Sequence, residues 1–107
     1  ALVTATGALE ATPKAQVDVS VKFKCLGGLV YLQTSVKNTD QTNVDVFVTG
    51  VGGSKEFLNM APGKTSSVSI NTRAATVGAG AVAYQAGFAG QERNVVDAAS
   101  YLPFSCQ

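Results

Sequence analysis

Apolar residues occupy every second position between residues 17 and 25 of this chain. The two interleaved sets are Val17, Val19, Val21, Phe23, Cys25 and Asp18, Ser20, Lys22, Lys24. This period matches a β-strand, in which successive side chains point to opposite faces. The alternation therefore predicts a strand with one face buried and the other in water.

Six further segments read as strands in the same way, most of them by alternation and the short 54–60 segment without a clear assignment of faces. They cover 30–36, 44–48, 54–60, 66–72, 82–88 and 93–104. Gly, Asn, Asp and Pro lie between them, and these residues favour turns. Ala61-Pro62-Gly63-Lys64 has Pro and Gly at the two central positions, which predicts a type II turn.

Two stretches are expected to be irregular. The Ala- and Gly-rich segment 74–80 could hold one helical turn. The last strand, 93–104, is expected to bulge or break around 97–100, and Pro103 predicts an edge or terminal position for it.

Seven strands without an amphipathic helix between them predict an all-β fold, namely an antiparallel immunoglobulin-like β-sandwich of about seven strands. A chain of 107 residues has room for one such domain. Residues 1–14 lack the alternation and contain Pro13, so we interpret them as a linker or leading edge segment. Residues 15–107 are then the β-sandwich module.

Composition removes several classes of function. Eight Lys and Arg against seven Asp and Glu give a formal net charge of +1, too little to favour nucleic acid or an anionic membrane. The chain has no His, which removes the commonest general base and metal ligand. It also has no Trp, the strongest sugar-stacking side chain. We expect a monomer without a metal or other cofactor.

The expected strand directions place the two cysteines at the same end of the sandwich. The first and seventh strands of an up-and-down order run in the same direction, so Cys25 at the end of the first and Cys106 after the last lie at the same end. We therefore predict a disulfide, which implies a secreted, extracellular protein. The alternative is a pair of free thiols in a cytosolic protein. A zinc site is disfavoured because two sulfurs fall short of four ligands.

The same parity sorts the loops. The polar segments 38–43, 61–64 and 89–92 share one end of the sandwich and the Gly-rich segments the other. Loops on a rigid scaffold are common recognition surfaces, so Asp40 in the polar group is a candidate ligand-binding residue. The oxygen-rich run 38–45 could instead hold calcium, but it lacks the pattern of an EF-hand loop, and a plain hairpin turn is the better interpretation.

Two aromatic residues fall on the rows opposite the apolar stripes. Tyr31 and Phe47 are therefore candidate ligand-binding residues, because a sugar ring packs on an exposed aromatic face. The alternative is that each ring packs under a loop or against a neighbouring domain. Catalysis is not expected: Ser54-Lys55 is the wrong spacing for a nucleophile and base, and nothing places two acids across a cleft.

Several short segments carry a family resemblance. They are VSVKFKCLGG (19–28), VYL (30–32), NTD (38–40), VDV (44–46), APGK (61–64), TR (72–73) and SC (105–106). Together they resemble a small β-sandwich accessory module, carbohydrate-binding-like, that is appended to secreted actinobacterial polysaccharide-degrading enzymes.

The resemblance implies a non-catalytic accessory module of a secreted glycoside hydrolase that binds carbohydrate weakly, with a polysaccharide or the parent catalytic domain as partner. A structural spacer or protein-interaction domain without a sugar ligand is the alternative, and a free-standing inhibitor or adhesin fragment is a third possibility. The lack of Trp departs from most binders of crystalline polysaccharides and disfavours flat cellulose or chitin surfaces.

Overall fold

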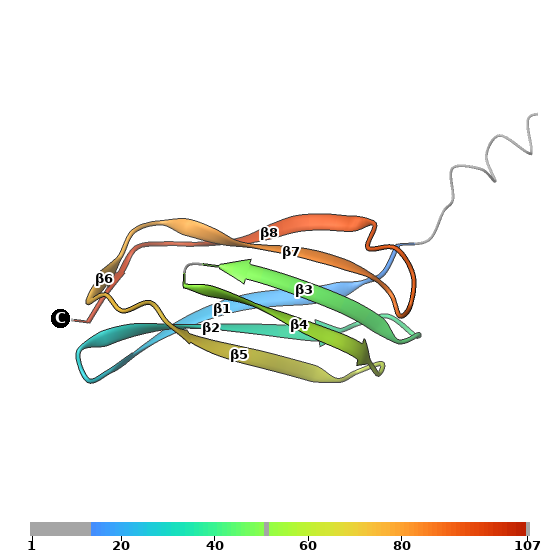
Figure 1. The fold of residues 1–107 in the computed structure, drawn as a ribbon, viewed down its shortest axis with the longest axis horizontal. Coiled ribbons are helices and arrows are strands. Elements are labelled where there is room, and N and C mark those ends of the chain that lie inside the picture. The colour runs from blue at the N-terminus through green and yellow to red at the C-terminus, as the bar shows by residue number, and fades with distance from the viewer. Residues whose placement is uncertain (1–13, 51, 107) are drawn as a thin grey trace, which may run out of the picture.

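The computed structural model describes residues 14–50 and 52–106, and Figure 1 shows them as antiparallel β-structure. The strands are β1 (Val17–Leu26), β2 (Leu29–Asn38), β3 (Val44–Gly50), β4 (Gly53–Met60), β5 (Thr65–Asn71), β6 (Thr76–Val77), β7 (Gly80–Phe88), β8 (Val95–Tyr101) and β9 (Phe104–Ser105). Within the described ranges no helix is long and apolar enough to cross a membrane.

The strands form a sandwich of two main sheets. One sheet has the order β1-β2-β5 and the other the order β4-β3-β7-β8. The chain passes from one sheet to the other after β2 and β4, and again between β5 and β7, as in immunoglobulin-like sandwiches. The predicted all-β sandwich is confirmed. The described residues contain nine strands instead of about seven, because a short β6-β9 pair closes one end.

The inward rows of β2 and β3 form the centre of the core. On β2, Val30, Leu32, Thr34 and Val36 are at most 1% exposed, which is the row that alternation predicts. The facing sheet contributes a second set of fully or almost fully buried side chains: Val44, Val46, Val48, Val82 and Ala86. Burial of one such Val or Leu contributes about 1.5–3 kcal/mol, so these two rows hold the sheets together.

A β-bulge explains why the faces of the 54–60 segment are ambiguous in the sequence. Val44 pairs with Met60 and Val46 with Phe57, so two residues of β4 oppose one of β3. The two extra residues are Leu58, which is 60% exposed, and Asn59, whose φ is 56°. The bulge lets both Phe57 and Met60 pack on the core although they are three residues apart.

Two local expectations are wrong. Segment 74–80 forms no helical turn, because Thr76 and Val77 pair with Ser105 and Phe104 as β6 and β9. The expected irregularity at 97–100 is also absent, since that segment pairs in unbroken register with β7. The break falls instead at Leu102-Pro103, where proline has no N–H to donate to a ladder. By contrast, the predicted turn at 61–64 is present, with Gly63 at φ 80°.

Cys25 and Cys106 form the expected disulfide, with their Cα atoms 5.6 Å apart. The bridge joins the β1–β2 hairpin to the segment that follows β9, and we call this end of the sandwich the disulfide end. Beside it the Phe23 ring stacks on Phe104 with centroids 5.0 Å apart and meets Tyr101 edge-on. The bridge and the three rings together fix the last strand against β1.

Removal of the bridge should destabilise the protein without changing its sheet content. The cysteines are 81 residues apart, and a cross-link over that distance removes about 4–5 kcal/mol of chain entropy from the unfolded state, less any native strain. We expect the variant Cys25→Ala/Cys106→Ala to lose several kcal/mol in urea unfolding while its far-UV circular dichroism stays the same. An unchanged free energy of unfolding would contradict a stabilising role for the bridge.

Candidate functional site at the polar loop end

Three connections meet at the end of the sandwich opposite the disulfide, as strand parity predicts. They are the β2–β3 loop (39–43), the β4–β5 turn (61–64) and the β7–β8 loop (89–94), and we call this end the loop end (Figure 1). Backbone bonds tie them together. The Asn38 amide donates to the Lys64 carbonyl at 2.9 Å, and the Ala89 amide to the Asn43 carbonyl at 3.0 Å.

Asn38 is the centre of this arrangement. Its side chain is 0% exposed and makes three hydrogen bonds to the loops. The Nδ2 group donates to the carbonyls of Thr42 and Met60, each at 2.9 Å, while Oδ1 accepts from the Asp40 amide at 2.7 Å. A buried amide group without partners would cost several kcal/mol, so these bonds fix the loops relative to β2 and β4.

The Asp40 carboxylate stabilises the β2–β3 loop by accepting hydrogen bonds from backbone amides. Its Oδ1 accepts from the amides of Gln41 and Thr42, and its Oδ2 accepts from the Gln16 amide at 3.1 Å. Partial desolvation raises the pKa of this carboxyl, but the bonds from Gln41, Gln16 and Thr42 outweigh it and hold the pKa below its ordinary value. Asp40 therefore holds the entry into β1 against the loop.

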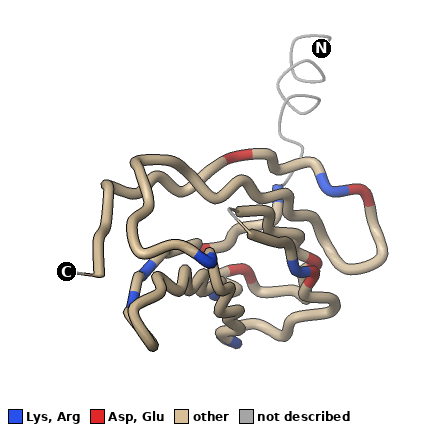
Figure 2. The backbone as a smooth tube through the Cα atoms, turned by 60° about the vertical axis from the view of Figure 1, so that its left-hand side comes forward, with Lys and Arg blue, Asp and Glu red and all other residues tan. Residues whose placement is uncertain are grey.

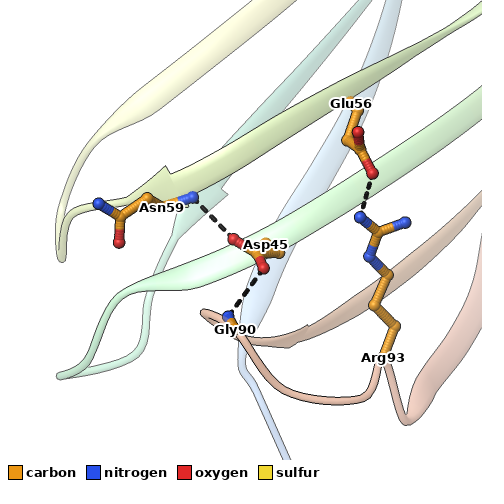
Figure 3. A network of polar contacts seen from close by, with 5 residues as sticks. All are labelled: Asp45, Glu56, Asn59, Gly90 and Arg93. Atoms are coloured by element: carbon orange, nitrogen blue, oxygen red, sulfur yellow. Dashed lines mark hydrogen bonds and ion pairs between the residues drawn. The ribbon is translucent and has the colours of Figure 1, made fainter.

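Asp45 also accepts hydrogen bonds from backbone amides at the loop end, through its carboxylate. It is 9% exposed, and its Oδ1 accepts from the Asn59 amide at 2.7 Å while Oδ2 accepts from the Gly90 amide at 3.0 Å (Figure 3). The Asn59 side chain in turn accepts from Asn43 at 2.8 Å. Asp45 thus joins the β4 bulge to the β7–β8 loop.

The β7–β8 loop folds back over the outer face of the four-stranded sheet. Gly87 on that face is buried because the backbone of Glu92 and Arg93 lies directly on it. Arg93 then reaches across to form an ion pair with Glu56 (Figure 3). Its guanidinium carbon lies 5.9 Å from the centre of the Phe47 ring, within the range of a cation–π contact.

The β2–β3 loop, the β7–β8 loop and Asn59 of the β4 bulge border an open depression of about 700 Å³. Its lining consists of four residues with side-chain amides, one with a hydroxyl, one with a carboxylate, one aromatic residue and one alanine: Gln41, Asn43, Asn59, Gln91, Thr42, Asp40, Phe88 and Ala89. Phe88 is half-buried and packs on the end of the core. The depression therefore presents a polar rim beside an apolar surface.

The three candidate ligand-binding residues lie on three separate surfaces. Asp40 lines the depression, Tyr31 is on the outer face of the β1-β2-β5 sheet, and Phe47 is on the outer face of the other sheet. The two aromatic residues therefore cannot form one platform. Phe47 is half-buried under Arg93, whereas Tyr31 lies between its cross-strand neighbours Lys24 and Asn71.

The sequence did not indicate that Asp45 joins two loops, or that Asn59, Phe88 and Gln91 line the depression. The loop 89–92 was expected at this end, but nothing in the pattern showed that it folds back over β3. A buried outward-facing Gly87 is the feature that permits this, and a glycine in a strand is a weak signal for close backbone approach. In the described residues no three His, Cys, Asp or Glu side chains gather as a metal site.

Comparisons with known proteins identify no family. No family model matches the chain, and no curated protein matches it. Among solved structures, β-glucosidase 3B from Thermotoga neapolitana in complex with glucose aligns with a TM-score of 0.37 and 14% identity. The alignment covers 85% of this chain but 17% of the β-glucosidase chain. The resemblance to accessory modules of polysaccharide-degrading enzymes therefore stays a prediction.

Gly87→Ala should displace the β7–β8 loop. A Cβ atom there would meet the Glu92 carbonyl and lie 2.7 Å from the Arg93 Cα, and backbone cannot move aside as a side chain can. We expect a loss of about 1–3 kcal/mol in stability and a large shift of the Gly90 amide resonance as its bond to Asp45 breaks. Gln85→Ala, two residues away on the same face, is the control. An unchanged Gly90 resonance in Gly87→Ala would show that the loop is not held on the sheet.

Proposed function

We propose that this domain is a non-catalytic, secreted accessory module of a glycoside hydrolase and that it binds soluble carbohydrate weakly in the depression at the loop end. The observation that carries the proposal is the lining of that depression. Four residues with side-chain amides, Gln41, Asn43, Asn59 and Gln91, line it together with the half-buried Phe88.

This lining suits the chemistry of a sugar. An amide both donates and accepts hydrogen bonds, as a hydroxyl group does, so several amides can pair with neighbouring sugar hydroxyls. The apolar face of the sugar ring can pack on Phe88. Because the depression is open, a bound sugar keeps much of its hydration, and we expect weak affinity.

The framework around the depression favours recognition over catalysis. Both oxygens of the Asp40 carboxylate and both oxygens of the Asp45 carboxylate accept hydrogen bonds from backbone amides. The two side chains therefore hold the loops in place. A rim that is ordered before binding loses little entropy when the ligand arrives. The Cys25–Cys106 bridge supports the secreted location, because disulfides persist in oxidising compartments.

One observation favours the spacer alternative. Gln16 hydrogen-bonds to Thr39 and Asp40, so the chain enters β1 at the loop end, whereas Cys106 lies at the disulfide end because it is bonded to Cys25. Figure 1 shows the start of β1 and the C-terminal end on opposite sides of the sandwich. Connections at opposite ends suit a module that separates two neighbours along a chain. A spacer needs no ligand, so a binding measurement distinguishes the two functions.

Affinity electrophoresis through gels that contain neutral xylan, arabinan or β-glucan tests the proposal. We expect retardation in at least one polymer and about a five- to tenfold loss of affinity in Gln41→Ala/Gln91→Ala, because two hydrogen bonds are removed. Both side chains are on exposed residues of the rim, so the variant should fold. The matched control is Gln85→Ala, which removes the same kind of group from the exposed outer face of the four-stranded sheet.

Two outcomes would overturn the loop-end site. Equal loss in the control variant would place carbohydrate binding on a sheet face. Absence of retardation in every polymer would favour the spacer function.

A further inference from the structure

The outer face of the β1-β2-β5 sheet is a regular grid of polar side chains around one aromatic ring. The cross-strand rows are Lys24, Tyr31, Asn71; then Lys22, Gln33, Ser69; then Ser20, Ser35, Ser67; and last Asp18, Lys37, Thr65. The first row lies near the disulfide end and the last near the loop end. Tyr31 is therefore flanked by a cation on β1 and an amide on β5.

Positive charge gathers in the two rows near the disulfide end. Lys22 and Lys24 are two residues apart on β1, a separation of about 6.6–6.8 Å along the strand. Asp18 is the one acidic residue of these four rows. It lies two rows from Lys22, toward the loop end, and is opposite Lys37 in the β1–β2 register. In Figure 2 basic segments lie toward the lower left of the view, on the same side as the C-terminal end.

Arg73 adds a third cation to this corner. Thr72 donates twice to the Val30 carbonyl and Val30 donates to the Ala74 carbonyl, so segment 72–74 runs alongside the residue that precedes Tyr31. Arg73 is exposed and its φ is 61°. Among the described residues the one ion pair is Arg93–Glu56, so Lys22, Lys24 and Arg73 form no ion pair within that part of the chain.

We propose that this corner, formed by Tyr31, Lys22, Lys24 and Arg73, binds a glycan that carries carboxylate groups. A uronic acid unit offers a carboxylate beside a ring with an apolar face, which matches cations beside a half-buried aromatic ring. Gln33 and Asn71 lie in the same two rows and can pair with hydroxyls. A nucleic acid fits less well, since a net charge of +1 gives little affinity for a phosphate backbone.

This surface is separate from the depression at the loop end. None of its residues lines that depression, and the two lie at opposite ends of the sandwich. The inference therefore does not depend on the neutral sugar site. The variant Gln41→Ala/Gln91→Ala should leave binding of an acidic glycan unchanged.

Affinity electrophoresis in polygalacturonate, a carboxylated glycan, tests the inference. We expect retardation that weakens with added salt and falls about tenfold in Lys22→Gln/Lys24→Gln, because two exposed ion pairs are lost. Tyr31→Ala should also weaken it, about threefold or more. Lys55→Gln/Lys64→Gln is the matched control, since it removes the same charge from exposed positions outside this corner.

Two other polymers decide which feature of the ligand is recognised. Fully methyl-esterified polygalacturonate keeps the sugar ring but lacks the charge, and polyglutamate keeps the charge but lacks the sugar. The inference requires stronger retardation by polygalacturonate than by either. It is overturned by equal retardation in polyglutamate, by equal loss in the Lys55→Gln/Lys64→Gln control, or by no retardation in polygalacturonate.

Discussion

The loop end of this sandwich depends on one buried amide. The side chain of Asn38 bonds to Thr42, Met60 and Asp40, while its backbone bonds to Gly63 and Lys64. It therefore links the end of β2 to the following loop, to the end of β4 and to the β4–β5 turn. Since a buried polar group is costly without partners, the loops cannot move away from Asn38 one at a time.

This constraint explains how the acidic residues of the loop end are used. Asp40 and Asp45 sit on either side of the Asn38 network and accept backbone amides from the entry to β1, the β4 bulge and the β7–β8 loop. Both carboxylates therefore stabilise the conformation of the loops, and Asp40 also lines the depression. The exposed amides of Gln41 and Gln91 are then left on an ordered rim.

Much of the sandwich could be predicted from the sequence, because period-two alternation and turn residues act locally. Strand parity then placed Cys25 with Cys106 and the polar loops together without knowledge of the sheets. What could not be predicted depends on register and on sheet membership. The bulge at Leu58 and Asn59 appears only when β4 is paired with β3, and the opposite locations of Tyr31 and Phe47 follow from the sheet that each strand joins.

Hydrogen exchange of backbone amides in Asn38→Ala tests the central role of this residue most directly. Val36→Ala, two residues earlier on the same buried row, controls for a general loss of stability. We predict that Asn38→Ala selectively loses protection at the Asp40, Gly63 and Lys64 amides, while protection in β2 and β5 falls no more than in Val36→Ala. The same exchange pattern in both variants would show that the loops are held by the sandwich as a whole and not by Asn38.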